Sequence, residues 1–270
     1  MPAIQLRVDL ILEFHHSDLS AAIRGNPLSE EIIDHCDGSL LTITLNRPEH
    51  GNGLNDTLIA QLASLLQGAA ARARMVLLKA AGDDFCVGRI APRGAAAPKL
   101  EALAARRGRD VIFNCYSAFR ESPLPVIAAV QGRALGFGCA IAACADITIA
   151  AHDASFQMPE FGENIMPTIA MSALLGKVTA KQLMYVAYST AVVTAERAEH
   201  LGIVSEVAPG RGGLELAVER ICAQILKAPQ AAVLAIKEFA RVAPCMDIHG
   251  AIDYARSLHA VINSSSEMRP

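Results

Sequence analysis

The first candidate functional residues are glycines that precede an alanine-rich apolar segment in the middle of the chain. The run Ala134-Leu135-Gly136-Phe137-Gly138 leads from a predicted buried strand at Val126–Val130 into this segment, whose composition predicts about two turns of helix. The first N–H groups of a helix have no partner inside it, and the helix dipole adds positive potential there. The sequence therefore predicts a place that can hold negative charge, permanent or transient.

A basic segment offers a second place where an anion can bind. Residues 89–110 hold six Lys and Arg residues against Glu101 and Asp110. The basic residues are Arg89, Arg93, Lys99, Arg106, Arg107 and Arg109. The same pattern is equally typical of a solvated helix face. No metal-ligand cluster is predicted, because the pair His15-His16 has no partner ligands near it and none of the seven cysteines forms a C-x-x-C pair.

These groups must be positioned by alternating strands and helices. Apolar and alternating runs predict strands at Leu40–Leu45, 75–79, Val126–Val130, 146–150, Ser155–Gln157 and 203–207. Helical periodicity predicts helices at 54–67, 99–121, 169–175, 180–188 and Ala195–Leu201, then two or three more within 213–263. Asn55 is placed as an N-cap, and Asp37-Gly38 as a tight turn. The order indicates an α/β (α+β) fold with a helical C-terminal part.

Composition limits the classes of function. Apolar residues make up 52% of the 270 residues and aromatic residues only 4%, so the core must consist mainly of small aliphatic side chains. The net charge of −3 gives no reason to expect a nucleic acid partner. An odd number of cysteines without pairing motifs favours reduced thiols and a cytoplasmic location. We expect no signal peptide and no membrane span, because no apolar run approaches eighteen residues.

Four stretches in order resemble the crotonase superfamily, also called the enoyl-CoA hydratase/isomerase family, as a divergent member. They are Leu45-Asn46-Arg47-Pro48 with Asn52-Gly53-Leu54-Asn55; Phe85-Cys86-Val87-Gly88; the run from Ala128 to Cys139; and Thr194-Ala195-Glu196-Arg197-Ala198 leading into Leu201-Gly202-Ile203-Val204. The resemblance runs from about residue 32 to 261. It implies a spiral core of ββα turns at residues 32–207 and a C-terminal helical region at 208–270 that builds trimers or hexamers. Residues 1–31 are left as an N-terminal extension.

The resemblance also implies acyl-coenzyme A thioesters as substrates and an enolate-like intermediate whose oxygen is held by two backbone N–H groups. By motif position, these donors are expected to be Val87, beside Gly88, and Phe137, after Gly136. Glycines there allow a substrate to approach the backbone closely. No cofactor is expected apart from the coenzyme A of the substrate. Lys237, in a C-terminal helix, matches a lysine that can reach coenzyme A in this family.

The resemblance assigns the acid–base chemistry to Glu160, in the pair Pro159-Glu160. Hydratases of the family use a second glutamate at the position of Ala140, which can neither transfer a proton nor orient a water. One carboxylate suffices to move a proton between two carbons, so double-bond isomerisation is favoured over hydration. Glu163 is either an auxiliary group or a solvated neighbour. Decarboxylation, ring opening, thioester hydrolysis and a catalytically inactive coenzyme A-binding protein remain alternatives.

Overall fold

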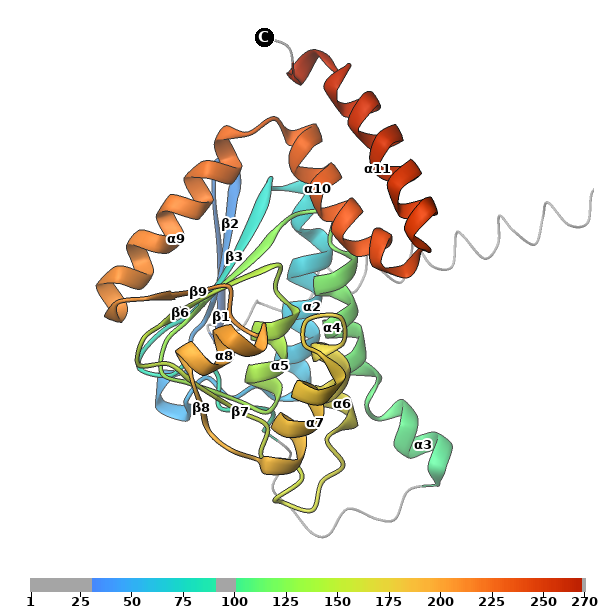
Figure 1. Cartoon of the computed structure of the whole chain (residues 1–270). Helices are drawn as coiled ribbons and strands as arrows, with labels where there is room; N and C mark the ends of the chain where they lie inside the picture. Colours follow the sequence, from blue (N-terminus) through green and yellow to red (C-terminus); the bar gives the residue numbers. More distant parts are fainter. Residues whose placement is uncertain (1–30, 91–100, 269–270) are drawn as a thin grey trace, which may run out of the picture. The chain divides into compact units, whose positions relative to one another are not determined.

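The computed structural model describes residues 31–90 and 101–268, so the predicted N-terminal extension, the pair His15-His16, Arg93 and Lys99 lie outside the described residues. The described chain is a mixed α/β fold with two sheets (Figure 1). The strands are β1 (Ile32–Asp37), β2 (Leu40–Leu45), β3 (Met75–Ala80), β4 (Val126–Val130), β5 (Arg133–Leu135), β6 (Ile147–Ala151), β7 (Ser155–Gln157), β8 (Val193–Thr194) and β9 (Glu206–Ala208). The α/β class predicted from the sequence is confirmed.

The larger sheet has six strands in the order β1-β2-β3-β4-β6-β9. β1 pairs with β2 antiparallel through a two-residue turn in which Gly38 has a φ of +57°, and every other neighbouring pair is parallel. The central strand β4 is apolar and buried at every residue, because helices cover both faces of the sheet there. In a smaller sheet, β5-β7-β8, the strands β5 and β7 each follow a strand of the large sheet, β4 and β6, after a short turn.

Helices cover the two faces of the large sheet unequally (Figure 1). The main core packs against α2 (Asp56–Gly68), α4 (Asp110–Glu121) and α5 (Phe137–Cys144), and a smaller core packs against α9 (Gly210–Lys227). The remaining helices are α3 (Ala102–Arg107), α6 (Thr168–Leu174), α7 (Ala180–Ser189), α8 (Ala195–Leu201), α10 (Gln230–Val242) and α11 (Ile248–Asn263). Asn55 caps α2 as predicted, since its side chain accepts the Leu58 N–H at 3.0 Å.

Two predicted elements differ from the structure. The single helix predicted at 99–121 is two helices, α3 and α4, because Gly108 ends α3 by donating to the Ala104 carbonyl and Asp110 starts a new helix. The strand predicted at 203–207 begins three residues later, as β9. Ile203 and Val204 instead donate their N–H groups to the Ala198 carbonyl at the end of α8, which leaves neither free to pair with a strand.

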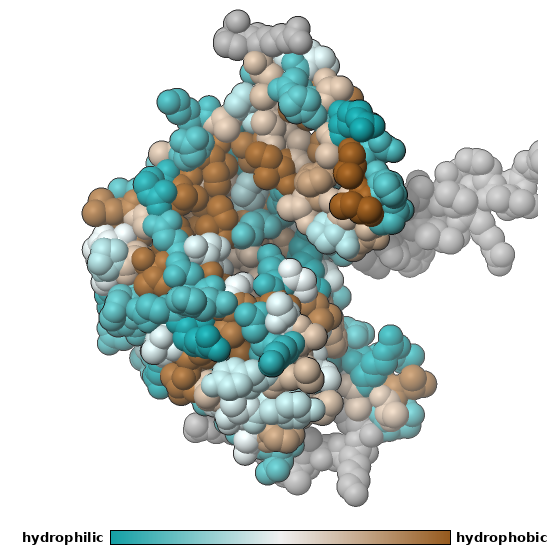
Figure 2. All heavy atoms as spheres, viewed as in Figure 1, coloured by the Kyte–Doolittle hydropathy of each residue, from teal (hydrophilic) through white to brown (hydrophobic). Residues whose placement is uncertain are grey.

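The C-terminal helices α10 and α11 carry large apolar side chains that stay exposed. Ile236, Ile248, Ile252 and Val261 are each between 49% and 71% exposed. Figure 2 shows apolar residues gathered over these two helices. Exposed apolar patches of this kind are typical of surfaces that meet another protein. Within the described ranges, no helix is both long enough and apolar enough to span a bilayer.

Candidate active site

Two short turns, residues 85–88 and residues 135–138, are held against each other beside the small sheet. The Cys86 N–H donates to the Arg133 carbonyl at 3.0 Å, and the Leu135 N–H donates to the Cys86 carbonyl at 2.9 Å. Gly138 fits only because it lacks a side chain, since a Cβ there would lie 2.0 Å from the Cys86 carbonyl oxygen. The glycines recognised in the sequence therefore bring two distant segments into direct backbone contact.

The peptide between Gly88 and Arg89 has a fixed orientation. Gly88 has a φ of +117°, and its carbonyl accepts the Leu54 N–H at 3.0 Å. The N–H of a trans peptide points opposite to its carbonyl, so the Arg89 N–H points away from Leu54. Among the described residues this N–H has no protein acceptor, and Gly88 and Arg89 both line a cavity.

The peptide between Gly136 and Phe137 is fixed in the same way. Gly136 has a φ of +50°, and its carbonyl accepts the Ala140 N–H at 3.0 Å, the first hydrogen bond of α5. The Phe137 N–H consequently points out of the start of the helix, where no backbone acceptor is available. Gly136 and Phe137 line the same cavity as Gly88 and Arg89. Two free N–H groups, each following a glycine with positive φ, therefore belong to one cavity.

The expectation that Val87 supplies one of these donors is wrong. Its N–H already donates to the Gly51 carbonyl at 2.9 Å, which ties the turn to the segment that follows β2. A hydrogen bond inside the protein would have to break before this N–H met a substrate. The Val87 side chain still lines the cavity. Two residues further along, the Arg89 N–H is free and turned away from Leu54, and the motif alone did not reveal this shift.

Glu160 lies immediately beyond β7, opposite Gly136. Its Oε1 atom would be 3.0 Å from a Cβ built on Gly136, and its Oε2 atom is buried with no partner among the described residues. Burial raises the pKa of the Glu160 carboxyl above its usual range, and the negative charge of Glu163 raises it further, while the N–H of Glu160 itself acts in the opposite direction. A carboxylate with a free oxygen and a raised pKa is suited to exchanging protons.

The turn that carries Glu160 also positions Glu163. Glu163 and Ile165 donate their N–H groups to the Glu160 carbonyl at 3.1 and 2.8 Å, and Asn164 adopts a φ of +58°. Asparagine tolerates this left-handed conformation better than most residues. Glu163 is exposed at the edge of the cavity, so it influences Glu160 through its charge and not through a hydrogen bond.

The cavity that joins these groups has a volume of about 680 Å³. Its walls come from the two turns, from α4, from the segment after β7 and from the start of α6. Besides the residues already described, the walls contain Arg109, Ile112, Tyr116, Leu135, Gln157, Pro159, Met166, Pro167, Thr168, Ile169 and Ala170. A mostly apolar cavity of this size with a few converging polar groups is typical of a small-molecule site.

One face of α4 lines the cavity from its mouth inward. Arg109, Ile112 and Tyr116 are spaced to share one side of the helix, and Arg109 is exposed whereas Tyr116 is only 3% exposed. The ring of Tyr116 stacks on that of Phe137, with the ring centroids 5.7 Å apart and the planes at 19°. Sequence reasoning missed Tyr116, although the i, i+3, i+7 spacing was available as a signal.

The predicted cations are distributed unevenly around this cavity. The Arg89 guanidinium forms a bidentate pair with Asp56 at 2.6 and 2.8 Å, which holds the pKa of that carboxyl below its usual range. Lys237 does not line the cavity. Its ammonium group donates to the carbonyls of Phe119 and Leu124 and to Asp146, at 3.3, 2.7 and 2.8 Å.

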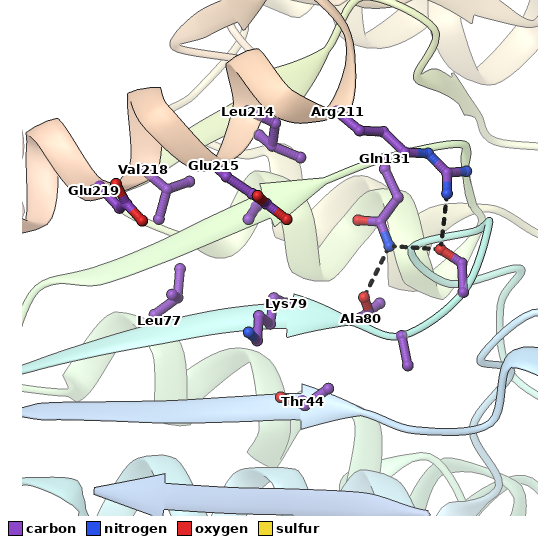
Figure 3. Close-up of a pocket in the computed structure, with 13 residues that line it drawn as sticks. Thr44, Leu77, Lys79, Ala80, Gln131, Arg211, Leu214, Glu215, Val218 and Glu219 are labelled. Carbon is purple, nitrogen blue, oxygen red and sulfur yellow. Dashed lines mark hydrogen bonds between the residues drawn. The ribbon is translucent and has the colours of Figure 1, made fainter. Parts of the chain in front are cut away.

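A second cavity of about 500 Å³ lies on the other face of the large sheet, beneath α9 (Figure 3). Two of its polar side chains, Gln131 and Arg211, close the loop after β3. Gln131 donates to the Ala80 and Gly82 carbonyls at 2.9 and 3.3 Å, and Arg211 donates to the Asp83 carbonyl at 3.2 Å. These groups are engaged in holding the loop, so the cavity beside Glu160 is the better candidate for chemistry.

Comparisons with known proteins show which proteins this chain is similar to. A family model described as enoyl-CoA hydratase/isomerase matches residues 35–268. The 2,3-dehydroadipyl-CoA hydratase of Escherichia coli (strain K12) is 31% identical over 220 residues, which cover 79% of this chain and 84% of that protein. The 1,2-epoxyphenylacetyl-CoA isomerase of the same strain is 33% identical over 189 residues, covering 67% and 70%. A solved enoyl-CoA hydratase of Mycobacterium smegmatis shares the fold with a TM-score of 0.81 at 25% identity, covering 89% of this chain and 93% of that one.

Proposed function

Because this chain belongs to the enoyl-CoA hydratase/isomerase family, we propose that it transforms an acyl-coenzyme A thioester through an enolate in the cavity beside Glu160. In this proposal the N–H groups of Arg89 and Phe137 donate to the thioester oxygen, and the Glu160 carboxylate exchanges protons with the acyl chain. The only cofactor-like group required is the coenzyme A of the substrate itself.

The two N–H groups act by stabilising charge that develops during the reaction. Removing a proton next to the thioester carbonyl, or adding a nucleophile to a conjugated double bond, places negative charge on the carbonyl oxygen. Fixed donors stabilise this oxygen more than they stabilise the neutral substrate, and one such donor contributes roughly 3–4 kcal/mol in acyl-transfer enzymes. The peptides of Gly88 and Gly136 are each held through their carbonyls, which supports this role because little reorganisation is needed.

The observation that carries the proposal is the unpartnered Oε2 atom of Glu160. A buried carboxylate oxygen without a partner costs free energy, and such a cost is commonly found where the group has a chemical task. With Ala140 in place of a second carboxylate, the simplest reaction is double-bond isomerisation. Glu160 removes a proton from one carbon, the enolate forms, and the same proton returns to another carbon, so atoms and charge balance with one base.

Hydration is the second candidate because the relatives include enzymes named as enoyl-CoA hydratases. These are the 2,3-dehydroadipyl-CoA hydratase of Escherichia coli (strain K12) and the crotonyl-CoA hydratase of Syntrophomonas wolfei. Both candidate reactions pass through the same enolate. They differ in whether a water molecule must be held beside the double bond, so one assay can separate them.

Two further parts of the proposal concern binding and assembly. Among the described residues, the exposed Arg109 that lines the cavity is a cation placed to meet coenzyme A phosphates, whereas Lys237 reaches them only after leaving three partners. We also propose that the exposed apolar residues of α10 and α11 pack against other copies of the chain in a trimer or a hexamer.

The test is to incubate the protein with 2-enoyl- and 3-enoyl-coenzyme A thioesters of graded chain length and to identify the products. Isomerisation moves the double bond without a change of mass, whereas hydration adds one water. Glu160→Gln should lower either rate by a factor of about 10² to 10⁴, the usual contribution of general acid–base catalysis. Glu215→Gln, in the second cavity, is the matched control. Equal rates for wild type and Glu160→Gln would rule out Glu160 as the base.

A further inference from the structure

Two polar side chains in the cavity wall bond to no other residue. Of the lining residues that the structure describes as buried or half-buried, Tyr116 and Glu160 are the two whose polar side chains make no hydrogen bond or ion pair to another residue. Gln157, by contrast, donates to the Thr190 carbonyl, and Arg89 is paired with Asp56. Glu160 Oε2 is a buried oxygen without a partner, whereas the Tyr116 hydroxyl is open to the cavity and free to bond a molecule held there.

The position of the Tyr116 ring is fixed. It stacks on Phe137, the residue whose N–H is proposed to meet the thioester oxygen, with the ring centroids 5.7 Å apart. It also lies one turn beyond Ile112 at the inner end of the α4 face that lines the cavity. A ring that is held on one side by Phe137 and on the other by its own helix directs its hydroxyl to a constant place in the cavity.

Burial keeps this hydroxyl protonated. Burial is the main cause that raises the pKa of Tyr116 above its usual value, with smaller contributions in the same direction from Cys144, Cys115 and the carboxylate of Glu160. A phenol in this state donates one hydrogen bond and accepts another, but it does not act as a base near neutral pH. It therefore complements Glu160, which accepts when ionised.

From this pair we propose that Tyr116 is a catalytic residue for hydration, because its hydroxyl holds the water that Glu160 deprotonates. This inference rests on the proposed enolate reaction and names the group that stands in for the carboxylate missing at Ala140. A water between two oxygens is bonded by both, which fixes the direction of its lone pair toward the double bond. Glu160 alone leaves that direction free.

The step balances without any other reactant. Glu160 takes one proton from the water as the water oxygen bonds to C3 of the enoyl group, and the π electrons of the C2–C3 bond move to form the enolate. The proton on Glu160 then passes to C2 as the enolate collapses to the thioester, so one H and one OH have been added. Tyr116 forms and breaks no covalent bond.

The test compares hydration with isomerisation in the same protein. Tyr116→Phe keeps the ring and its stacking on Phe137 but removes the hydroxyl, so it should lower the hydration rate of a 2-enoyl-coenzyme A about tenfold or more. The isomerisation rate of the matching 3-enoyl-coenzyme A should change less than about twofold. Tyr185→Phe, on α7 and 51% exposed, is the matched control and should leave both rates unchanged. Thermal melting of each variant checks that the fold is intact.

Each outcome is decisive. A fall in hydration alone supports the inference, and loss of both reactions in Glu160→Gln shows that the shared enolate step is also present. Equal loss of both reactions in Tyr116→Phe would mean that the hydroxyl supports the fold or the enolate and does not hold a water. Unchanged hydration in Tyr116→Phe, or no hydration by the wild type, overturns the inference. Failure of the proposed function is recognised separately, because neither reaction then responds to Glu160→Gln.

Discussion

The Oε1 atom of Glu160 faces the Cα of Gly136 so closely that a Cβ on residue 136 would lie 3.0 Å away from it. Gly136 also has a φ of +50°, which most side chains avoid. Gly136→Ala should therefore displace the Glu160 carboxylate and turn the Phe137 N–H away from the cavity. We expect activity to fall by about two orders of magnitude and stability to fall by about 1–3 kcal/mol. Steady-state kinetics and urea unfolding measure the two effects.

Gly176→Ala is a control that separates backbone strain at a positive φ from displacement of the Glu160 carboxylate. Gly176 has a φ of +78°, but no atom lies within 4 Å of the position that its Cβ would take. This variant should show a similar loss of stability with activity retained. Similar activities for Gly136→Ala and Gly176→Ala would contradict the proposed contact between residue 136 and Glu160.

The pH dependence of activity should reveal the coupling between Glu160 and Glu163. Glu160 acts as a base only when ionised, so the rate should rise with pH through its raised pKa. The charge of Glu163 contributes to the raised pKa of Glu160. Glu163→Gln should consequently move the acid limb of the pH–rate profile to lower pH. High salt should reduce the difference between the two proteins, because the interaction of an exposed charge is screened. An acid limb that stays in place, or moves to higher pH, would contradict this coupling.

The ionised carboxylate of Glu160 should lower the stability of the folded protein. Its pKa is higher in the folded protein than the ordinary 4.5, so the folded state binds the proton more tightly than the unfolded state does. The cost is absent when the carboxyl is protonated in both states, and it grows as pH rises through the ordinary pKa toward the folded one. Glu160→Gln should therefore be more stable than wild type at neutral pH, and this gain should vanish below pH 4.5. Urea unfolding at both pH values measures it, with Glu215→Gln as the control.

Much of this fold could be predicted from the sequence, because local patterns determine it. The alternation in Leu40–Leu45, the apolar run Val126–Val130 and the Asn55 cap each depend on neighbouring residues, and the structure has all three. The shift of the strand from 203–207 to β9 depends on Ile203 and Val204 bonding to the end of α8, which no alternation reveals.

The candidate site was predictable only where a backbone conformation carries a sequence signal. Gly136 and Gly88 mark the two turns, but the direction of each N–H depends on which distant group bonds its carbonyl. Leu54 does so for Gly88, which makes Arg89 and not Val87 the residue with a free N–H. Tyr116 was missed for a similar reason, because its value depends on stacking against Phe137, a contact between two helices.

Gly138 should be the least replaceable glycine among these turns. A Cβ on residue 138 would lie 2.0 Å from the Cys86 carbonyl oxygen, and this neighbour is backbone that two hydrogen bonds hold in place. Gly138→Ala should cost more than about 3 kcal/mol, within the range of severe overpacking and backbone effects, and should separate the two turns of the site. Gly212→Ala, in α9 with open space around the new Cβ, should instead be neutral or stabilising by about 0.5–1 kcal/mol. Equal stabilities for the two variants would contradict the close contact.

Lys237 tests whether a buried cation is needed for the fold or for the substrate. Its side chain is only 9% exposed, and its ammonium pairs with Asp146, which also accepts the Val126 N–H at the start of β4. Burial lowers the pKa of Lys237, while the charge of Asp146 opposes that shift. Lys237→Met keeps the apolar stem but removes one hydrogen-bond donor from the Asp146 carboxylate and from the carbonyls of Phe119 and Leu124. We expect a loss of about 1–3 kcal/mol in the free energy of unfolding, less than for a fully buried pair because the Asp146 carboxylate remains open to water. The dissociation constant for coenzyme A, measured by calorimetry on the folded variant, should change less than about twofold. A direct contact worth about 1.4 kcal/mol would change it about tenfold. A tenfold weaker affinity with unchanged stability would instead support the direct contact with coenzyme A that the family resemblance implies.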